Sequence, residues 1–289
     1  MYIYSSNNEY NVKQLIAKNG LTSTPAIFGT GEDALAIVGS CDHKVHAISF
    51  ATSIVVWSYN TDDVVSSTPA IVGTDSNALV IASSEDGRAH AIWINDDTNK
   101  PGKKGTAKWT YQTGDRVTSS PAIVGTCEDT LAIVGSYDSH VHAIRIRDGT
   151  AQWIYKTGDH VISSPAIAGT GPDALVIVGS CDHHVHAIRI ATGTEQWTYK
   201  TGGYVRSTPA IVGQDALAIV GSFDYHVHAI RISTGTKQWT YKTGGCVSSS
   251  PVIVGTGEDT LAIVGSGDNH VHAIQIATGT QQWAYKTGS

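Results

Sequence analysis

A unit of about 44 residues recurs six times along the chain, and this repetition limits the possible folds more than any other feature. A proline marks the start of each copy, at intervals of 44, 52, 44, 44 and 42 residues. These prolines are Pro25, Pro69, Pro121, Pro165, Pro209 and Pro251. A tryptophan near the end of each copy keeps the same rhythm, at Trp57, Trp109, Trp153, Trp197, Trp239 and Trp283. Internal periods of this length are typical of solenoids, propellers and similar arrays.

Each copy contains four short runs rich in Val, Ile, Thr, Tyr and Trp, with turn residues between them. In the clearest copy these runs are 165–168, 175–180, 185–190 and 196–200. Such runs are too short for helices and have the composition of β-strands. Four strands per repeat predict the blade of a β-propeller, whereas a solenoid would have fewer strands and a shorter period.

The two ends of the chain differ from the regular repeat. Residues 1–20 align with the third and fourth strands of a blade, and no first and second strands follow Trp283. The sequence therefore predicts an all-β fold of six complete four-stranded blades plus an N-terminal half blade at residues 1–20. Residues 21–289 are expected to form one propeller domain, and the pattern leaves open a six- or a seven-bladed ring.

Composition restricts the class of protein. Charged residues make up 15% of the chain and the formal net charge is -6, so we expect no nucleic-acid partner. No window of about twenty apolar residues predicts insertion into a membrane. The first residues have neither a basic leader nor an apolar run, so we expect a soluble, cytoplasmic protein. Its cysteines are expected to be unbridged, as suits a reducing compartment.

The segment from Ala187 to Trp197 resembles the tryptophan-docking motif Ala-x-Asp-x-x-Thr-Gly-x-x-x-Trp of the quinoprotein-type (PQQ-like) propeller repeat. The segments 229–239 and 273–283 are equally similar, although other residue types replace the Asp of the motif in every copy. The resemblance implies that all six tryptophans join neighbouring blades. The family includes quinone-dependent dehydrogenases, outer-membrane assembly scaffolds and sensor domains. The dehydrogenases have an adjacent cysteine pair that is missing from this sequence, so no cofactor is expected.

Three positions vary between copies while their neighbours scarcely change, and propeller geometry places all three at the same end of the molecule. One lies in the loop between blades, and two flank the Asp of the turn between the second and third strands. Variable aromatic, Arg and His side chains around one end are typical of a recognition surface, and neutral drift of exposed turns is the alternative. The residues predicted to bind a partner are Arg116, His160, Tyr204, Tyr137, Phe223, Tyr225 and His183.

Histidines form a second repeated pattern. One histidine of the third strand recurs in all six copies, at His46, His90, His142, His186, His228 and His272. In four copies a second histidine, at His140, His184, His226 or His270, precedes it by two residues on the same face of the strand. Such pairs are weak candidates for zinc, copper or nickel ligands. We interpret the repeated histidine instead as a partly buried residue between blades, and the Asp of each turn as a backbone hydrogen-bond acceptor.

The sequence is most consistent with a non-enzymatic binding or scaffold propeller that presents its variable loops to a protein, a peptide or a small ligand. No unique catalytic constellation stands out, because almost every polar residue recurs in several copies. The alternatives are a quinone- or metal-dependent redox enzyme at the propeller axis and a sensor module of a larger signalling protein. An unpaired blade edge would also favour association of identical chains.

Overall fold

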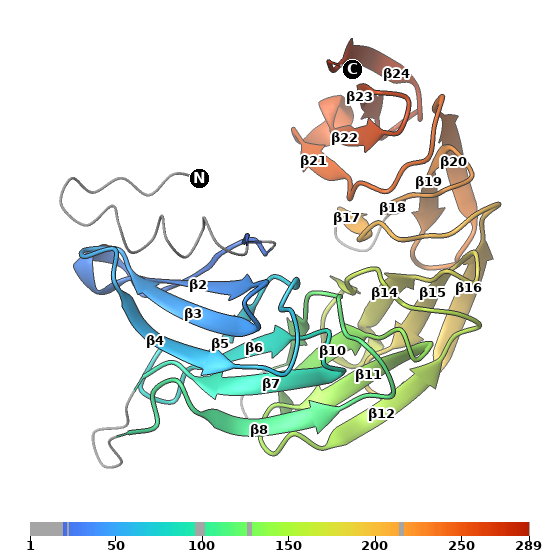
Figure 1. The fold of residues 1–289 in the computed structure, drawn as a ribbon. Coiled ribbons are helices and arrows are strands. Elements are labelled where there is room, and N and C mark those ends of the chain that lie inside the picture. The colour runs from blue at the N-terminus through green and yellow to red at the C-terminus, as the bar shows by residue number, and fades with distance from the viewer. Residues whose placement is uncertain (1–19, 22, 96–101, 126–128, 214–216, 289) are drawn as a thin grey trace. The chain divides into compact units, whose positions relative to one another are not determined.

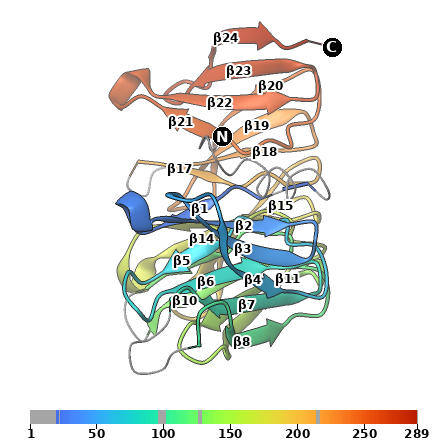
Figure 2. The same cartoon turned by 60° about the vertical axis from the view of Figure 1, so that its left-hand side comes forward.

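The computed structural model describes residues 20–21, 23–95, 102–125, 129–213 and 217–288. The half blade predicted at residues 1–20 lies outside the described residues, except for Gly20. Within the described part, each repeat forms one four-stranded sheet, and the strands of a sheet lie side by side in chain order (Figures 1 and 2). The predicted four strands per copy are therefore confirmed. None of the described residues forms a helix that is long and apolar enough to cross a membrane.

The chain divides into two compact units, Met1–Ser136 with Ala143–Gln152, and Tyr137–His142 with Trp153–Ser289. Blade 1 contains β1 (Ala26–Phe28), β2 (Leu35–Ser40), β3 (Lys44–Ser49) and β4 (Val55–Asn60). Blade 2 contains β5 (Ala70–Val72), β6 (Leu79–Ser83), β7 (Arg88–Trp93) and β8 (Ala107–Gln112). The boundary between the units falls within blade 3, which contains β9 (Ala122–Val124), β10 (Leu131–Gly135), β11 (His140–Arg145) and β12 (Ala151–Lys156).

The second unit contains the last three blades. Blade 4 contains β13 (Ala166–Ala168), β14 (Leu175–Gly179), β15 (His184–Arg189) and β16 (Glu195–Lys200). Blade 5 contains β17 (Ala210–Val212), β18 (Leu217–Gly221), β19 (His226–Arg231) and β20 (Lys237–Lys242). Blade 6 contains β21 (Val252–Val254), β22 (Leu261–Ser266), β23 (His270–Gln275) and β24 (Gln281–Lys286). Short 3-10 helices precede the second strands of blades 1, 4 and 6, namely η1 (Gly31–Asp33), η3 (Gly171–Asp173) and η4 (Gly257–Asp259).

Burial differs systematically between the strands of a blade. In blade 4, every residue of β14 is buried, β15 is buried at its four central residues, and β16 is buried only at Trp197. The first strand has three residues because the preceding proline has no N–H group to pair with β14. The apolar core therefore lies between the sheets of consecutive blades, as in the cluster that joins Ile177 and Trp197 to Val220 and Ile230.

Tryptophans connect consecutive blades by packing and by one hydrogen bond each. The indole Nε1 of Trp197 donates to the carbonyl of Ile232 at 2.6 Å, and its ring lies over Gly235. Trp57, Trp109, Trp153 and Trp239 donate in the same way to Ile94, Ile146, Ile190 and Ile276. These five side chains are 7–9% exposed, whereas Trp283 of the last strand is 45% exposed.

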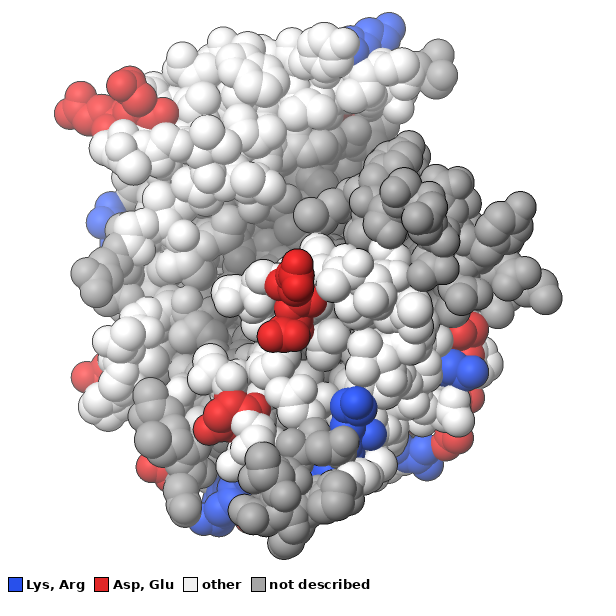
Figure 3. Space-filling view, turned by 90° about the vertical axis from the view of Figure 1, so that its left-hand side faces the viewer, with Lys and Arg blue, Asp and Glu red and all other residues white. Residues whose placement is uncertain are grey.

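Charged side chains are sparse on the surface. On the face shown in Figure 3, acidic and basic groups form small, separate patches among uncharged residues. This distribution follows from the low content of charged residues in the sequence.

Candidate functional site

The loop that enters blade 5 holds two exposed side chains between buried anchors. Val205 is fully buried, and its Cγ1 lies so close to Gly179 that a Cβ at this glycine would be 2.4 Å away. Ser207 is also buried, where its hydroxyl donates to the carbonyl of Gly221 and accepts from the N–H of the same residue. Because alternate residues of the loop are fixed inwards, Tyr204 and Arg206 point outwards.

Three of the predicted partner-binding residues meet at this loop. The ring of Tyr204 contacts His183 edge to face, with 5.1 Å between ring centroids, and lies 6.0 Å from the ring of Phe223. The N–H of Phe223 donates to the carbonyl of Tyr204 at 2.9 Å, which ties the loop to the turn of blade 5. Tyr204 remains 40% exposed. The cluster therefore presents aromatic surface on a backbone that is hydrogen-bonded in place.

Arg206 completes this cluster, and the sequence analysis missed it. Its guanidinium carbon lies 5.4 Å from the ring centre of Tyr204 and 5.0 Å from that of Phe223, within the range of cation–π attraction. A signal for it exists in the sequence, because the corresponding loop residues of the other blades carry no charge. Those residues are Thr22, Ser66, Thr118, Ile162 and Ser248.

A second contact of the same kind lies between blades 3 and 4. His160 packs on Tyr137 with 4.9 Å between ring centroids, and its Nδ1 donates to the carbonyl of Tyr137. The carbonyl of His160 accepts from the N–H of Cys181, whose thiol is a hydrogen-bond partner of Arg206. Burial raises the pKa of this thiol, and Arg206 opposes the rise.

Tyr225 and Arg116 have different surroundings. Tyr225 has a positive φ of 69° in the turn of blade 5, and its side chain is 49% exposed. Arg116 belongs to the first unit, where its guanidinium lies 3.7 Å from the carboxylate of Glu85. Arg116 therefore belongs to the first unit, whereas Tyr225 belongs to the second.

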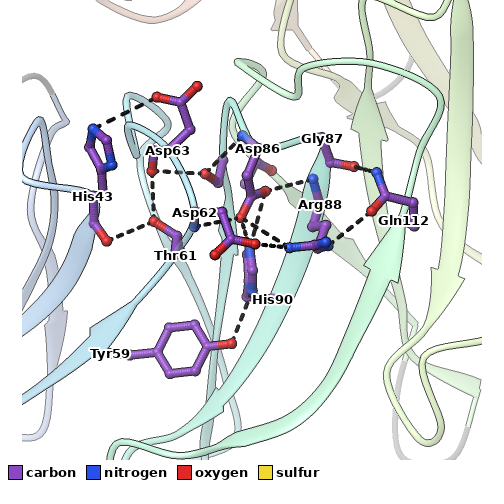
Figure 4. Close-up of polar contacts among 12 residues, drawn as sticks. His43, Tyr59, Thr61, Asp62, Asp63, Asp86, Gly87, Arg88, His90 and Gln112 are labelled. Atoms are coloured by element: carbon purple, nitrogen blue, oxygen red, sulfur yellow. Dashed lines mark hydrogen bonds and ion pairs between the residues drawn. The ribbon is translucent and has the colours of Figure 1, made fainter.

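In blades 2, 4, 5 and 6 the repeated histidine of the third strand links consecutive blades, as Figure 4 shows for His90. The Nε2 of His90 lies 3.0 Å from a carboxylate oxygen of Asp86, and its Nδ1 lies 3.1 Å from the hydroxyl of Tyr59 in the preceding blade. We call this arrangement the Asp–His–Tyr clasp. It recurs as Asp182–His186–Tyr155, Asp224–His228–Tyr199 and Asp268–His272–Tyr241. The tyrosines were not singled out in the sequence, although each follows its tryptophan by two residues in the same rhythm.

The partners of the clasp determine which atom holds each proton. An ionised carboxylate can only accept, so the Nε2 of His228 donates to Asp224, and in the neutral imidazole this leaves Nδ1 to accept the hydroxyl proton of Tyr199. Burial and the charge of Asp224 raise the pKa of Tyr199, which keeps its phenol protonated. Burial alone would raise the pKa of Asp224, but hydrogen bonds from His228 and from the N–H of Gly202 outweigh it and hold that pKa well below its usual range.

The two histidines of one third strand differ in how many of their ring nitrogens are already hydrogen-bonded. In blade 5 the clasp uses both ring nitrogens of His228, whereas His226 donates from Nδ1 to the carbonyl of Asp224 and has its side chain 33% exposed. The corresponding outer histidines are His140, His184 and His270. The described residues contain no group of three His, Cys, Asp or Glu side chains placed to hold a metal ion. Cys181 and Cys246 are free thiols, and Cys127 lies outside the described residues.

Comparison with known proteins identifies the family. A family model described as outer membrane protein assembly factor BamB matches residues 12–166 and, in a second match, residues 138–289. Among solved structures, the crystal structure of BamB from Moraxella catarrhalis is similar to this chain with a TM-score of 0.66 and 20% sequence identity. The similarity covers 90% of this chain and 72% of that one, and it confirms the predicted propeller fold. No curated protein sequence matches the chain. The resemblance to PQQ-like repeats is thus confirmed, and the chain belongs to the family described as outer membrane protein assembly factor BamB.

Proposed function

We propose that this chain is a non-enzymatic scaffold that binds a protein or peptide partner through one cluster of loops in its second unit. We call this cluster the aromatic surface, and it consists of His183, Tyr204, Arg206 and Phe223. Its partner would contact the exposed ring of Tyr204 together with the guanidinium of Arg206.

The observation that carries the proposal is the composition and support of this surface. Tyr and Arg are the side chains that most often dominate binding energy in protein interfaces. Here they are exposed while the backbone beneath them is fixed by buried Val205 and Ser207. A surface that is already ordered loses little conformational entropy when a partner binds. The name of the family model, an assembly factor, supports a protein-binding role of the same general kind.

The proposal is tested by selection from a library of random dodecapeptides displayed on phage, with the whole chain as the target. Selected peptides are then measured by titration against wild-type protein and two variants. We expect Tyr204→Ala to weaken binding by roughly tenfold or more, because truncation of an interface tyrosine typically costs over 1.4 kcal/mol. Tyr285→Ala is the matched control, since Tyr285 is 68% exposed on β24, outside the aromatic surface.

The control should bind like the wild type, and both variants should unfold at nearly the wild-type temperature. Peptides that bind wild-type protein and Tyr204→Ala equally well would show that binding takes place elsewhere. Failure to enrich any peptide on the wild type relative to Tyr204→Ala would contradict the proposed function itself.

A further inference from the structure

Arg206 differs from the other arginines in what its guanidinium contacts. Arg88, Arg116, Arg147 and Arg189 form ion pairs with Asp62, Glu85, Asp148 and Asp173. Arg145 donates to the carbonyl of Ala151, and Arg231 donates to the side-chain oxygen of Gln238. Among the described residues, Arg206 meets only the Cys181 thiol and two aromatic rings. Its charge therefore has no anionic partner within the described part of the chain.

The rings hold this guanidinium without consuming its hydrogen-bonding capacity. Tyr204 and Phe223 lie within cation–π range of its central carbon, and contacts of this kind use the faces of the rings. A thiol is a weak acceptor and occupies at most one of the five N–H donors. The remaining donors form a planar fork, whose geometry matches the two oxygens of a carboxylate. The Arg206 residue is exposed to solvent.

The surrounding charges favour a carboxylate over a phosphate. Sites for phosphorylated peptides usually gather several arginines, whereas this surface presents one. Asp159 and Asp182 also lie near enough to the Cys181 thiol to act on it electrostatically, so the neighbourhood of Arg206 already holds negative charge. A singly charged, planar group meets less repulsion there than a phosphate with nearly two charges.

We infer that Arg206 anchors the partner by pairing with a carboxylate of an acidic peptide segment, while apolar side chains of the same segment pack on Tyr204 and Phe223. This inference rests on the proposed function and adds the chemistry of the partner. The anchoring residue of the partner is a Glu or Asp side chain flanked by apolar residues.

The test uses the peptides selected on the wild type. Each acidic residue is replaced in turn by its amide, Glu by Gln or Asp by Asn, and by phosphoserine, and affinities are measured by fluorescence anisotropy. We expect one amide replacement to weaken binding to the wild type by roughly tenfold, as for a lost charge-assisted pair. Phosphoserine at that position should not restore the affinity.

The variants assign this effect to one guanidinium. In Arg206→Gln the acidic peptide and its amide should bind with nearly equal affinity, and Arg206→Lys should keep only part of the difference because an ammonium cannot form the planar fork. Arg231→Gln is the matched control, since it removes an exposed arginine of the same blade outside the aromatic surface, and it should retain the full difference.

Two results would overturn the inference. Peptides that need Tyr204 but bind equally well as acid and amide would leave the proposed function standing and exclude the carboxylate anchor. A full acid-to-amide difference in Arg206→Gln would place the carboxylate elsewhere on the protein. Absence of any Tyr204-dependent peptide would instead contradict the proposed function, so the two failures are distinguishable.

Discussion

At the residue scale, the Asp–His–Tyr clasp shows how a polar side chain is accommodated between two blades. His228 is only 5% exposed, and burial without partners would destabilise the fold by the cost of an unmade hydrogen bond. Asp224 of its own blade and Tyr199 of the preceding blade satisfy both ring nitrogens. Because the partners come from two blades, the clasp fixes the position of one blade against the next.

The strength of the clasp is measurable at its tyrosine. Tyr199→Phe removes the hydroxyl that donates to Nδ1 of His228 and leaves that nitrogen buried without its partner. We expect the free energy of unfolding to fall by about 1–3 kcal/mol in urea titrations. Tyr285→Phe changes the same position of β24, where the side chain is 68% exposed, and should change stability by less than about 0.5 kcal/mol. Equal effects of the two variants would show that the hydrogen bond adds nothing.

The carboxylates of the clasp predict acid sensitivity. Hydrogen bonds from histidine side chains and backbone N–H groups hold the pKa of Asp86, Asp182, Asp224 and Asp268 below the usual range, against the opposing effect of burial. The pKa of Asp in an unfolded chain is about 3.9. The stabilising contribution is therefore present above about pH 4 and is lost as the pH falls through the lower folded-state values.

Urea unfolding measured at a series of pH values between neutrality and about pH 2 checks this prediction. Wild-type stability should fall steeply below about pH 4, and Asp224→Asn should show a shallower fall because one of the four carboxylates is absent. Asp75→Asn, at an exposed carboxylate, should keep the wild-type slope. A slope in Asp224→Asn that equals that of the wild type would contradict the assignment.

At this scale, the sequence predicted where individual side chains lie better than which residues they contact. It placed Tyr204 and Phe223 at one end of the molecule, and the structure has their rings in contact. It did not find the bond between Tyr199 and His228, because these residues are 29 positions apart and belong to different repeats. It also passed over Arg206, although this loop position varies between copies as well and carries a charge only in blade 5.

At the element scale, the turn after the third strand forms a seat for the tryptophan of the preceding blade. Gly235 has φ of +68°, and a Cβ placed on it would lie 2.6 Å from the indole of Trp197. The turn therefore needs glycine both for its left-handed conformation and for the space above it. The four strands of each blade and their order followed from the repeat pattern, whereas this close approach needs coordinates from two blades.

These two requirements of the turn can be separated with a pair of glycine substitutions. Gly235→Ala introduces the left-handed strain of an L-residue, roughly 1–2 kcal/mol, and a steric clash with Trp197 of about 1–3 kcal/mol more. Gly171→Ala, at φ of +74° with nothing within 4 Å, carries the strain without the clash. Urea unfolding should show the larger loss of stability for Gly235→Ala. Equal losses would mean that the indole moves aside without cost.

At the scale of the whole molecule, the period alone predicted six sheets and their class. It did not predict the division into two compact units, whose boundary falls within blade 3. Because the copies are similar in sequence, the same contacts are expected in every blade. No sequence pattern therefore distinguishes the copy that contains the boundary between the two units. Because the rest of each repeat is so similar, Tyr204, Arg206 and Phe223 of the aromatic surface distinguish blade 5 from the other blades.

The tryptophan seat and the clasp together give blades 4 and 5 two complementary halves each. One half carries the tryptophan and the tyrosine of the fourth strand, and the other carries the histidine, the glycine turn and the carbonyl that accepts the indole proton. Recombination between similar gene segments can insert or remove one whole repeat. At the new junction, the fourth strand of one blade would then still meet a blade that carries the matching histidine, glycine turn and carbonyl. Blade number can change in this way without any new interface evolving. Selection for a particular partner then acts on the few loop residues, such as Arg206, that such an exchange adds or removes.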